Sequence, residues 1–222
     1  MTHYILGPAG KIEALVDDPA SLCTTADPAR MAVLTKHLDA PPPTAAVVLA
    51  HPHPLYGGTM HTKAVYHAAK AFCRLGCAVI RFNFRGVGAS AGTFADGVGE
   101  LDDFRAVMDF AESRYPAISL WAGGVSFGSW VGMTAGAQDE RVERIVGLAL
   151  PSALYDFSAV RDSPKPKFFI HGEHDEVCPL KSVRELYAQA SEPKDLVVIH
   201  AANHLFDGRL DEVGEAIEEL LG

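Results

Sequence analysis

Cysteine is scarce in this sequence, and its few positions are irregularly spaced. Cys23, Cys73, Cys77 and Cys178 show neither the dense pattern of a disulfide framework nor the paired C-x-x-C spacing of a zinc site. A chain of 222 residues can bury roughly 70% of the surface that its unfolded form exposes, so it needs no covalent cross-links. We expect reduced thiols, with Cys73 and Cys77 as buried small apolar residues.

Long apolar runs and an excess of positive charge are also lacking. No stretch approaches the 18 apolar residues of a membrane-spanning helix. The N-terminus lacks the basic segment, the apolar run and the small-residue cleavage site of a signal peptide. The 28 acidic residues outnumber the 19 basic ones, and the net charge of -9 would repel a nucleic-acid backbone. We therefore expect a cytoplasmic protein that binds neither membranes nor nucleic acid.

Short apolar runs alternate with longer amphipathic stretches through most of the chain. The runs lack period-two alternation, which is typical of parallel strands that helices cover on both faces. The predicted strands are residues 45–50, 78–84, 119–122, 145–150, 167–171 and 196–200. Apolar residues at i, i+3 and i+4 predict the intervening helices at residues 62–75, 100–113, 127–138, 180–190 and 210–221.

The N-terminal region departs from this alternation. Residues 4–6 and 12–16 flank Gly7-Pro8-Ala9-Gly10 and predict an antiparallel β-hairpin. Residues 31–38 fit either a strand or a short helix, which the three prolines at 41–43 would end, and both interpretations stay open. No linker divides the chain, so we expect a single α/β domain over residues 1–222 with a mostly parallel central sheet and helices on both faces.

A candidate nucleophile lies where one predicted strand gives way to a helix. The segment Gly124-Val125-Ser126-Phe127-Gly128 matches G-x-S-x-G in the strand-turn-helix context that a nucleophile elbow requires. Glycine at 124 and 128 would let the strand and the helix approach closely, which leaves Ser126 strained and exposed above the helix N-terminus. A glycine-rich turn with an N-cap serine is the alternative, but the context favours a nucleophile.

A nucleophilic serine needs a base, and the base needs an orienting acid. At such a strand-to-helix turn both partners should follow the serine, acid before histidine, each just after a strand. Asp175 and His204 occupy these positions. Glu173 and Glu176 are rival acids, and His200 is a rival base, although it falls inside the last predicted strand.

Several motifs together resemble the α/β-hydrolase superfamily, specifically the small, lid-poor bacterial serine hydrolases with H-P-x-P-x-x-G-G after the third strand. The motif here is His51-Pro52-His53-Pro54-Leu55-Tyr56-Gly57-Gly58, and residues 81–92 and 96–103 are also similar to that group. The likeness covers the hairpin and residues 44–222. Residues 20–43 depart from it, because this segment is longer than the resemblance implies.

The resemblance implies an oxyanion hole made of two backbone N–H groups. The first belongs to the residue after the nucleophile, Phe127. Pro52 and Pro54 have no N–H, so the second comes from His53 or, as the alternative, from Leu55. His51 is expected to brace this loop. Four polar residues of the later loops are expected to brace loops and not to act in catalysis: Asn83, Arg85, Asp96 and Glu100.

A metal site is the competing interpretation of the histidines. The potential ligands are His51, His53, His61, His171, His174 and Asp175. Metallohydrolase signatures such as H-x-H-x-D-H and H-E-x-x-H are absent, and the prolines on both sides of His53 favour a rigid oxyanion loop. We therefore expect no metal and no cofactor.

The expected activity is that of a serine hydrolase with an open cleft, because residues 151–166 are too few for a cap domain. The candidate walls of the cleft are Leu55, Tyr56, Trp130, Leu154, Tyr155, Phe157, Val177, Leu205 and Phe206. We expect a carboxylesterase that cleaves short-chain acyl esters through an acyl-enzyme. The alternatives are a thioesterase or an amidase or peptidase with the same triad, a metal-dependent hydrolase and a non-catalytic binding module. The expected partner is a small-molecule acyl substrate, and a homodimer is left open.

Overall fold

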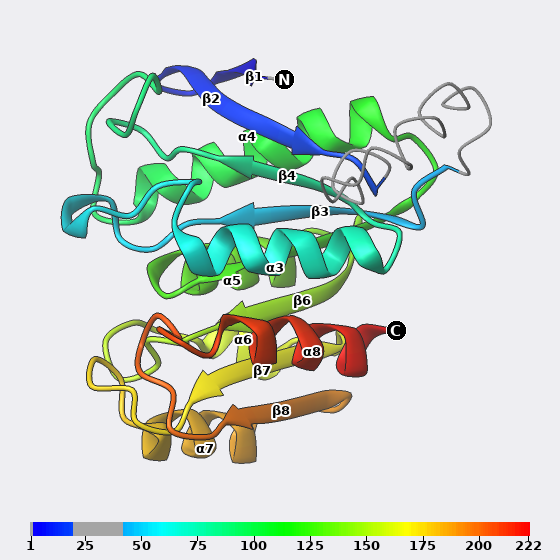
Figure 1. The fold of residues 1–222 in the computed structure, drawn as a ribbon. Coiled ribbons are helices and arrows are strands. Elements are labelled where there is room, and N and C mark those ends of the chain that lie inside the picture. The colour runs from blue at the N-terminus through cyan, green and yellow to red at the C-terminus, as the bar shows by residue number, and fades with distance from the viewer. Residues whose placement is uncertain (1, 20–41) are drawn as a thin grey trace, which may run out of the picture.

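An eight-stranded sheet forms the centre of the computed structural model, which describes residues 2–19 and 42–222. The strands are β1 (Thr2–Gly7), β2 (Gly10–Asp17), β3 (Ala45–Ala50), β4 (Ala78–Phe82), β5 (Ser119–Val125), β6 (Val142–Leu148), β7 (Lys167–Gly172) and β8 (Lys194–Ile199). Their order across the sheet is β1-β2-β4-β3-β5-β6-β7-β8 (Figure 1). The hairpin strands β1 and β2 are antiparallel, and β2 pairs with β4 in the antiparallel direction. The six strands from β3 to β8 are parallel to their neighbours among one another. The predicted sheet and hairpin are confirmed.

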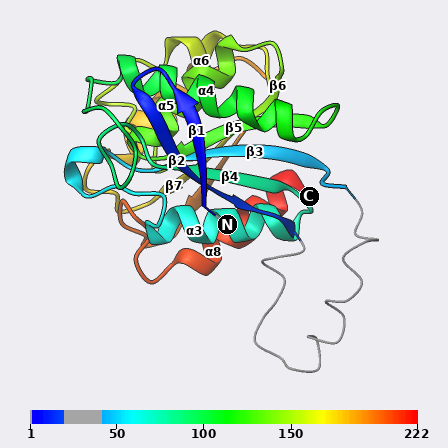
Figure 2. The ribbon, with the colours of Figure 1, turned by 90° about the horizontal axis from the view of Figure 1, so that it is seen from above.

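Helices cover both faces of this sheet. They are α3 (Lys63–Arg74), α4 (Val98–Arg114), α5 (Phe127–Gln138), α6 (Ser158–Asp162), α7 (Leu180–Gln189) and α8 (Leu210–Leu221). Seen from above, α3 and α8 lie on one face, and α4, α5 and α6 lie on the other (Figure 2). No helix within the described residues is both long enough and apolar enough to cross a membrane.

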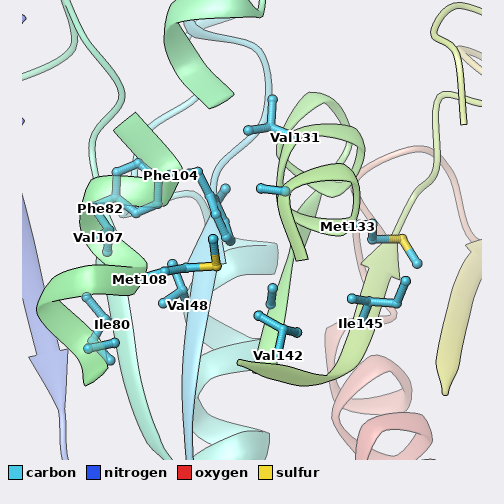
Figure 3. Close-up of a cluster of buried hydrophobic side chains, with 14 of the residues drawn as sticks. Val48, Ile80, Phe82, Phe104, Val107, Met108, Val131, Met133, Val142 and Ile145 are labelled. Carbon is cyan, nitrogen blue, oxygen red and sulfur yellow. The ribbon is translucent and has the colours of Figure 1, made fainter. Parts of the chain in front are cut away.

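The central strands bury side chains on both faces, which explains their unbroken apolarity. In β3, Val48 points into the core below α4 and α5, whereas its neighbours Val47 and Leu49 join the core below α3 and α8. Figure 3 shows the first core, where Phe104 of α4 and Val131 of α5 meet the sheet. Cys73 and Cys77 are buried in the second core, as predicted.

Some predicted boundaries were wrong by a few residues. Strand β5 continues to Val125 because its two glycines pair with β3 and β6 without side chains that would interfere. Strand β4 ends at Phe82 instead of residue 84, and β6 spans Val142–Leu148 instead of 145–150. Strand β8 ends at Ile199, because Ala201 at a φ of 53° turns the chain, so His200 is not a strand residue.

The sequence predicted a loop for the whole connection between β6 and β7, but the structure differs. The connection contains the five-residue helix α6, whose first residue Ser158 donates its N–H and its hydroxyl to the Asp156 carboxylate at 2.8 and 2.9 Å. No larger insertion occurs between these strands. The strand or helix predicted for residues 31–38 lies outside the described residues.

Candidate active site

The carboxyl ends of β3 and β7 lie at one edge of the sheet (Figure 1). Strand β5 pairs in parallel with β3 and ends at the same edge, where Ser126 follows it. Ser126 lies between β5 and α5 with a φ of 55°, a conformation that non-glycine residues rarely adopt. A Cβ atom at Gly124 would collide with the backbone of Gly128, and one at Gly128 would lie 2.5 Å from the His51 carbonyl. Gly124 is therefore required for β5 and α5 to meet, as the sequence predicted, whereas Gly128 is required because α5 lies against the end of β3.

Three of the predicted residues form a continuous chain of hydrogen bonds. His204 Nε2 lies 2.8 Å from Ser126 Oγ, and His204 Nδ1 lies 2.8 Å from Asp175 Oδ2. Because the carboxylate can only accept, Nδ1 carries the hydrogen and Nε2 is free to accept the serine proton. The Asp175 side chain is fully buried, and only 10% of the His204 side chain is exposed. The arrangement has the geometry of a nucleophile, a general base and an orienting acid.

Asp175 is held in place by the turn that follows it. Its Oδ1 accepts the backbone N–H groups of Val177 at 2.9 Å and Cys178 at 2.8 Å. Burial raises the pKa of this carboxyl, but hydrogen bonds from His204 and from the Cys178 N–H outweigh burial and hold it below its usual value. The acid is thus ionised at neutral pH, and its second oxygen is directed at the imidazole.

The rival residues serve other contacts. His200 is 83% exposed and pairs with Glu173, whose Oε2 lies 2.6 Å from His200 Nδ1. Glu176 accepts the backbone N–H of His204 at 3.2 Å, so its carboxylate links the acid loop to the histidine loop. This linking role of Glu176 was missed, because the sequence predicts that the two loops meet but not which carboxylate accepts a backbone N–H.

Two backbone N–H groups near Ser126 are available for an oxyanion. The N–H of Phe127, at the first position of α5, and the N–H of His53 have no acceptor within the described part of the chain. The N–H of Leu55 is already occupied, because it donates to His53 Nδ1 at 3.2 Å. Of the two candidates that the sequence left open, the geometry favours His53.

His51 braces the loop that carries His53, as predicted. Its Nδ1 donates to the Pro52 carbonyl at 2.6 Å, and its Nε2 accepts the N–H of Phe84 at 3.1 Å. Burial lowers the pKa of His51 to about 4, so the ring is neutral and can make both contacts at neutral pH. The loop after β3 is thereby attached to the loop after β4.

Three other polar residues brace the loops around the site, as predicted. Asn83 donates to Glu13 Oε2 at 2.8 Å, which joins the N-terminal hairpin to the loop after β4. Arg85 pairs with the buried Asp103 at 2.8 Å. Glu100 is fully buried and accepts backbone N–H groups just before α4.

An open cleft of about 430 Å³ reaches Ser126 and His204. Its lining is mostly apolar: Pro52, His53, Tyr56, Ser126, Phe127, Pro151, Leu154, Tyr155, Val177, His204 and Leu205. Five of the predicted wall residues line the cleft, and Leu55 and Phe157 do not: the five are Tyr56, Leu154, Tyr155, Val177 and Leu205. Trp130 supports it from behind, because its ring stacks on Tyr155 with the centroids 4.6 Å apart.

Phe206 does not line the cleft, which corrects its predicted place. Its side chain is fully buried in the core below α3 and α8, where it packs with residues such as Ile199 and Val213. The positive φ of 59° at Phe206 turns the backbone here, and the preceding residue, Leu205, faces the cleft instead.

The described residues include no group of three or more His, Cys, Asp and Glu side chains that could hold a metal ion. Two of the potential ligands named from the sequence make other contacts. His51 braces a loop, and His171 contacts the Cys178 carbonyl at 2.9 Å.

Comparisons with known proteins identify the family of this chain. A family model described as serine aminopeptidase, S33 matches residues 41–165. The chain is 32% identical to the uncharacterized protein RP471 of Rickettsia prowazekii over 98% of this chain and 87% of that protein.

Solved structures of similar length share both sequence and fold. An alpha-beta serine hydrolase homologue from Coxiella burnetii is 32% identical, with a TM-score of 0.87 over 100% of this chain and 97% of that chain. XC6422 from Xanthomonas campestris, described as an a/b serine hydrolase without lid, is 31% identical, with a TM-score of 0.84 over 99% of this chain and 92% of that chain. With the strained serine and the mostly parallel sheet described above, these matches show that the chain belongs to the α/β serine hydrolase family.

Proposed function

We propose that the protein is a carboxylesterase that cleaves short-chain acyl esters with Ser126 as nucleophile, His204 as general base and Asp175 as orienting acid. The observation that carries this proposal is the chain of two 2.8 Å hydrogen bonds that ends on a strained serine facing an open cleft. Each group is one that acyl transfer requires.

In the first half of the reaction, His204 Nε2 removes the Ser126 proton while Oγ attacks the ester carbonyl. The negative charge that develops on the carbonyl oxygen is stabilised by the N–H groups of Phe127 and His53. Asp175 stabilises the imidazolium and holds its orientation. His204 then gives its proton to the leaving alcohol, and the acyl group stays on Ser126.

In the second half, water replaces the alcohol. His204 takes a proton from a water molecule, which attacks the acyl carbonyl on Ser126 in the same oxyanion site. Collapse of the second intermediate breaks the bond to Oγ, and His204 returns its proton to the serine. The carboxylic acid leaves, and the enzyme regains its starting protonation state.

The lining of the cleft supports a neutral ester over two alternatives. An aminopeptidase substrate carries an ammonium group, and a coenzyme A thioester carries phosphates, so each calls for a charged partner in the site. Among the described residues that line the cleft, none bears a permanent charge. A small uncharged acyl ester needs only the apolar walls and the two backbone N–H groups.

The experiment that tests this function is the hydrolysis of p-nitrophenyl acetate by the wild type and by Ser126→Ala. The variant should lose at least about a thousandfold in kcat, because the nucleophile is removed. EDTA should leave the wild type unaffected. A fluorophosphonate should label the peptide that contains Ser126. Sustained activity in the variant, or activity lost to EDTA and restored by zinc, would overturn the serine mechanism.

A further inference from the structure

His171 lies next to the proposed triad, but the mechanism above gives it no part. It is the second-last residue of β7, its side chain is fully buried, and the chain reaches Asp175 only four residues later. A polar ring in such a place costs free energy unless its contacts repay the lost hydration. Its contacts therefore indicate what the ring does.

The contacts define the protonation state of His171. Its Nε2 lies 2.9 Å from the Cys178 carbonyl oxygen, and because a carbonyl can only accept, Nε2 carries a hydrogen. Its Nδ1 has no partner among the residues that the structure describes, so a second hydrogen there would be a buried donor without an acceptor. Burial also lowers the pKa of His171. The ring is therefore neutral, with its hydrogen on Nε2.

The same N–H group reaches a second acceptor. Nε2 of His171 lies 3.3 Å from Asp175 Oδ2, the oxygen that accepts the hydrogen bond from His204. The other carboxylate oxygen is already occupied by the N–H groups of Val177 and Cys178. The His171 N–H thus lies between the Cys178 carbonyl and the oxygen that faces the general base.

We propose that His171 is a positioning residue for the triad, which ties the turn at 175–178 to β7 and offsets part of the negative charge that Asp175 Oδ2 presents to His204. This inference rests on the proposed function, because it assigns His204 as the base. The role differs from catalysis, since His171 touches neither the serine nor the cleft.

A measurable consequence follows from the two ends of the carboxylate. The backbone N–H groups of Val177 and Cys178 keep Oδ1 bound within the turn when His171 loses its N–H, but Oδ2 then carries a less compensated charge. That charge stabilises the protonated imidazole of His204, so more alkaline conditions are needed to free the base. The other titratable groups near His204 are Glu176 from the acid loop, Ser126 from the elbow and His53 from the loop after β3, and none of them changes in this comparison.

The experiment compares the pH dependence of p-nitrophenyl acetate hydrolysis in His171→Leu and His171→Gln with that of the wild type. His171→Leu should move the acid midpoint of kcat/KM upward by about half a pH unit, while KM and the kcat plateau change by less than about threefold. His171→Gln keeps an N–H donor and should return the midpoint to the wild-type position. An unmoved or lowered midpoint in the leucine variant, or equal behaviour of the two variants, would overturn the proposal.

A second measurement does not depend on activity. Nitrogen NMR of the histidine rings in the wild type, with His171→Gln used to assign the signal, should show a neutral His171 with its hydrogen on Nε2. A charged ring, or a hydrogen on Nδ1, would overturn the inference. Full activity in Ser126→Ala would instead refute the proposed function, so the two failures are distinguishable.

Discussion

At the scale of single residues, two histidines four positions apart have opposite surroundings. His204 is buried between Ser126 and Asp175, whereas His200 is exposed and pairs with Glu173. His204→Ala should lower kcat by about 10⁴-fold or more, because the base is lost. His200→Ala is the matched control and should leave kcat within twofold, roughly the scatter expected of a remote surface change. Steady-state kinetics on p-nitrophenyl acetate measures both, and a damaging His200→Ala with a silent His204→Ala would refute the assignment.

We expect Asp175→Asn to lower kcat less than His204→Ala does. Asp175→Asn preserves the shape of the side chain, but the amide cannot hold the imidazole in the required tautomer as a carboxylate does. We expect a fall in kcat of up to about 10⁴-fold with KM little changed. Glu176→Gln provides the control, because its amide oxygen can still accept the N–H of His204. Equal losses in both variants would contradict the assignment of Asp175.

The sequence predicted that Ser126, Asp175 and His204 lie together, because chain order constrains them strongly. A serine in a strand-to-helix turn and two polar residues just after later strands must meet where parallel strands end. The cleft walls were less predictable. Leu205 and Phe206 are adjacent and both apolar, and only the backbone turn at a φ of 59° decides that Phe206 enters the core. Such a choice depends on tertiary packing that local sequence does not encode.

At the scale of elements, the loop after β3 depends on a close backbone contact. A Cβ atom at Gly58 would collide with the Pro52 carbonyl and lie 2.9 Å from the His53 carbonyl. Gly58→Ala should therefore displace the His53 N–H and lower kcat by roughly 10² to 10³, the usual effect of losing one oxyanion donor. Kinetics with p-nitrophenyl acetate tests this, with circular dichroism to check that the variant folds.

The neighbouring glycine offers a matched control in the same loop. Gly57 has a φ of 79°, but a Cβ atom there would meet nothing within 4 Å. Gly57→Ala should cost about 1 kcal/mol of folding free energy through the left-handed backbone, yet keep most of kcat. If both alanine variants lose the same activity, backbone strain and not the collision with Pro52 accounts for the loss.

The connection between β6 and β7 limits the size of the acyl group. It contributes Leu154, Tyr155 and the short α6, but no cap, so among the residues that the structure describes only the walls of an open cleft remove acyl carbons from water. Each buried CH₂ contributes about 0.8 kcal/mol, close to fourfold in kcat/KM, until the cleft ends. Across p-nitrophenyl esters, kcat/KM should therefore peak at roughly two to six acyl carbons. A profile that rises to palmitate would contradict the open-cleft argument.

The parallel sheet was predicted as a whole because its strands are buried on both faces, and burial on both faces leaves an unbroken apolar run. Element ends were harder to predict. His200 follows an apolar run and looked like a strand residue, but the turn at Ala201 ends the strand at Ile199. Residues 151–166 have no sustained helical periodicity, so the sequence did not predict α6. In the structure the Asp156 carboxylate accepts hydrogen bonds from Ser158 at the start of this helix.

At the scale of the whole molecule, buried neutral histidines should make the fold sensitive to mild acid. Burial lowers the pKa of His51 from 6.5 to about 4, so between these values the unfolded chain binds a proton that the folded chain excludes. Stability is therefore complete above pH 6.5 and is lost as the pH falls toward 4. From pH 7.5 to 5 this residue alone should cost about 2 kcal/mol, or roughly 4–8 °C in Tm. His171, whose pKa burial also lowers, acts in the same direction.

A non-titrating replacement separates this effect from the general response to acid. His51→Gln cannot take up a proton in either state, and its amide can still offer a donor to Pro52 and an acceptor to Phe84. Its free energy of unfolding should be lower than that of the wild type at pH 7.5, but should fall less steeply between pH 7.5 and 5. His200→Gln changes an exposed histidine and should keep the wild-type slope. Urea unfolding at several pH values measures each slope, and parallel curves for the wild type and His51→Gln would show that His51 is not the source of the acid sensitivity.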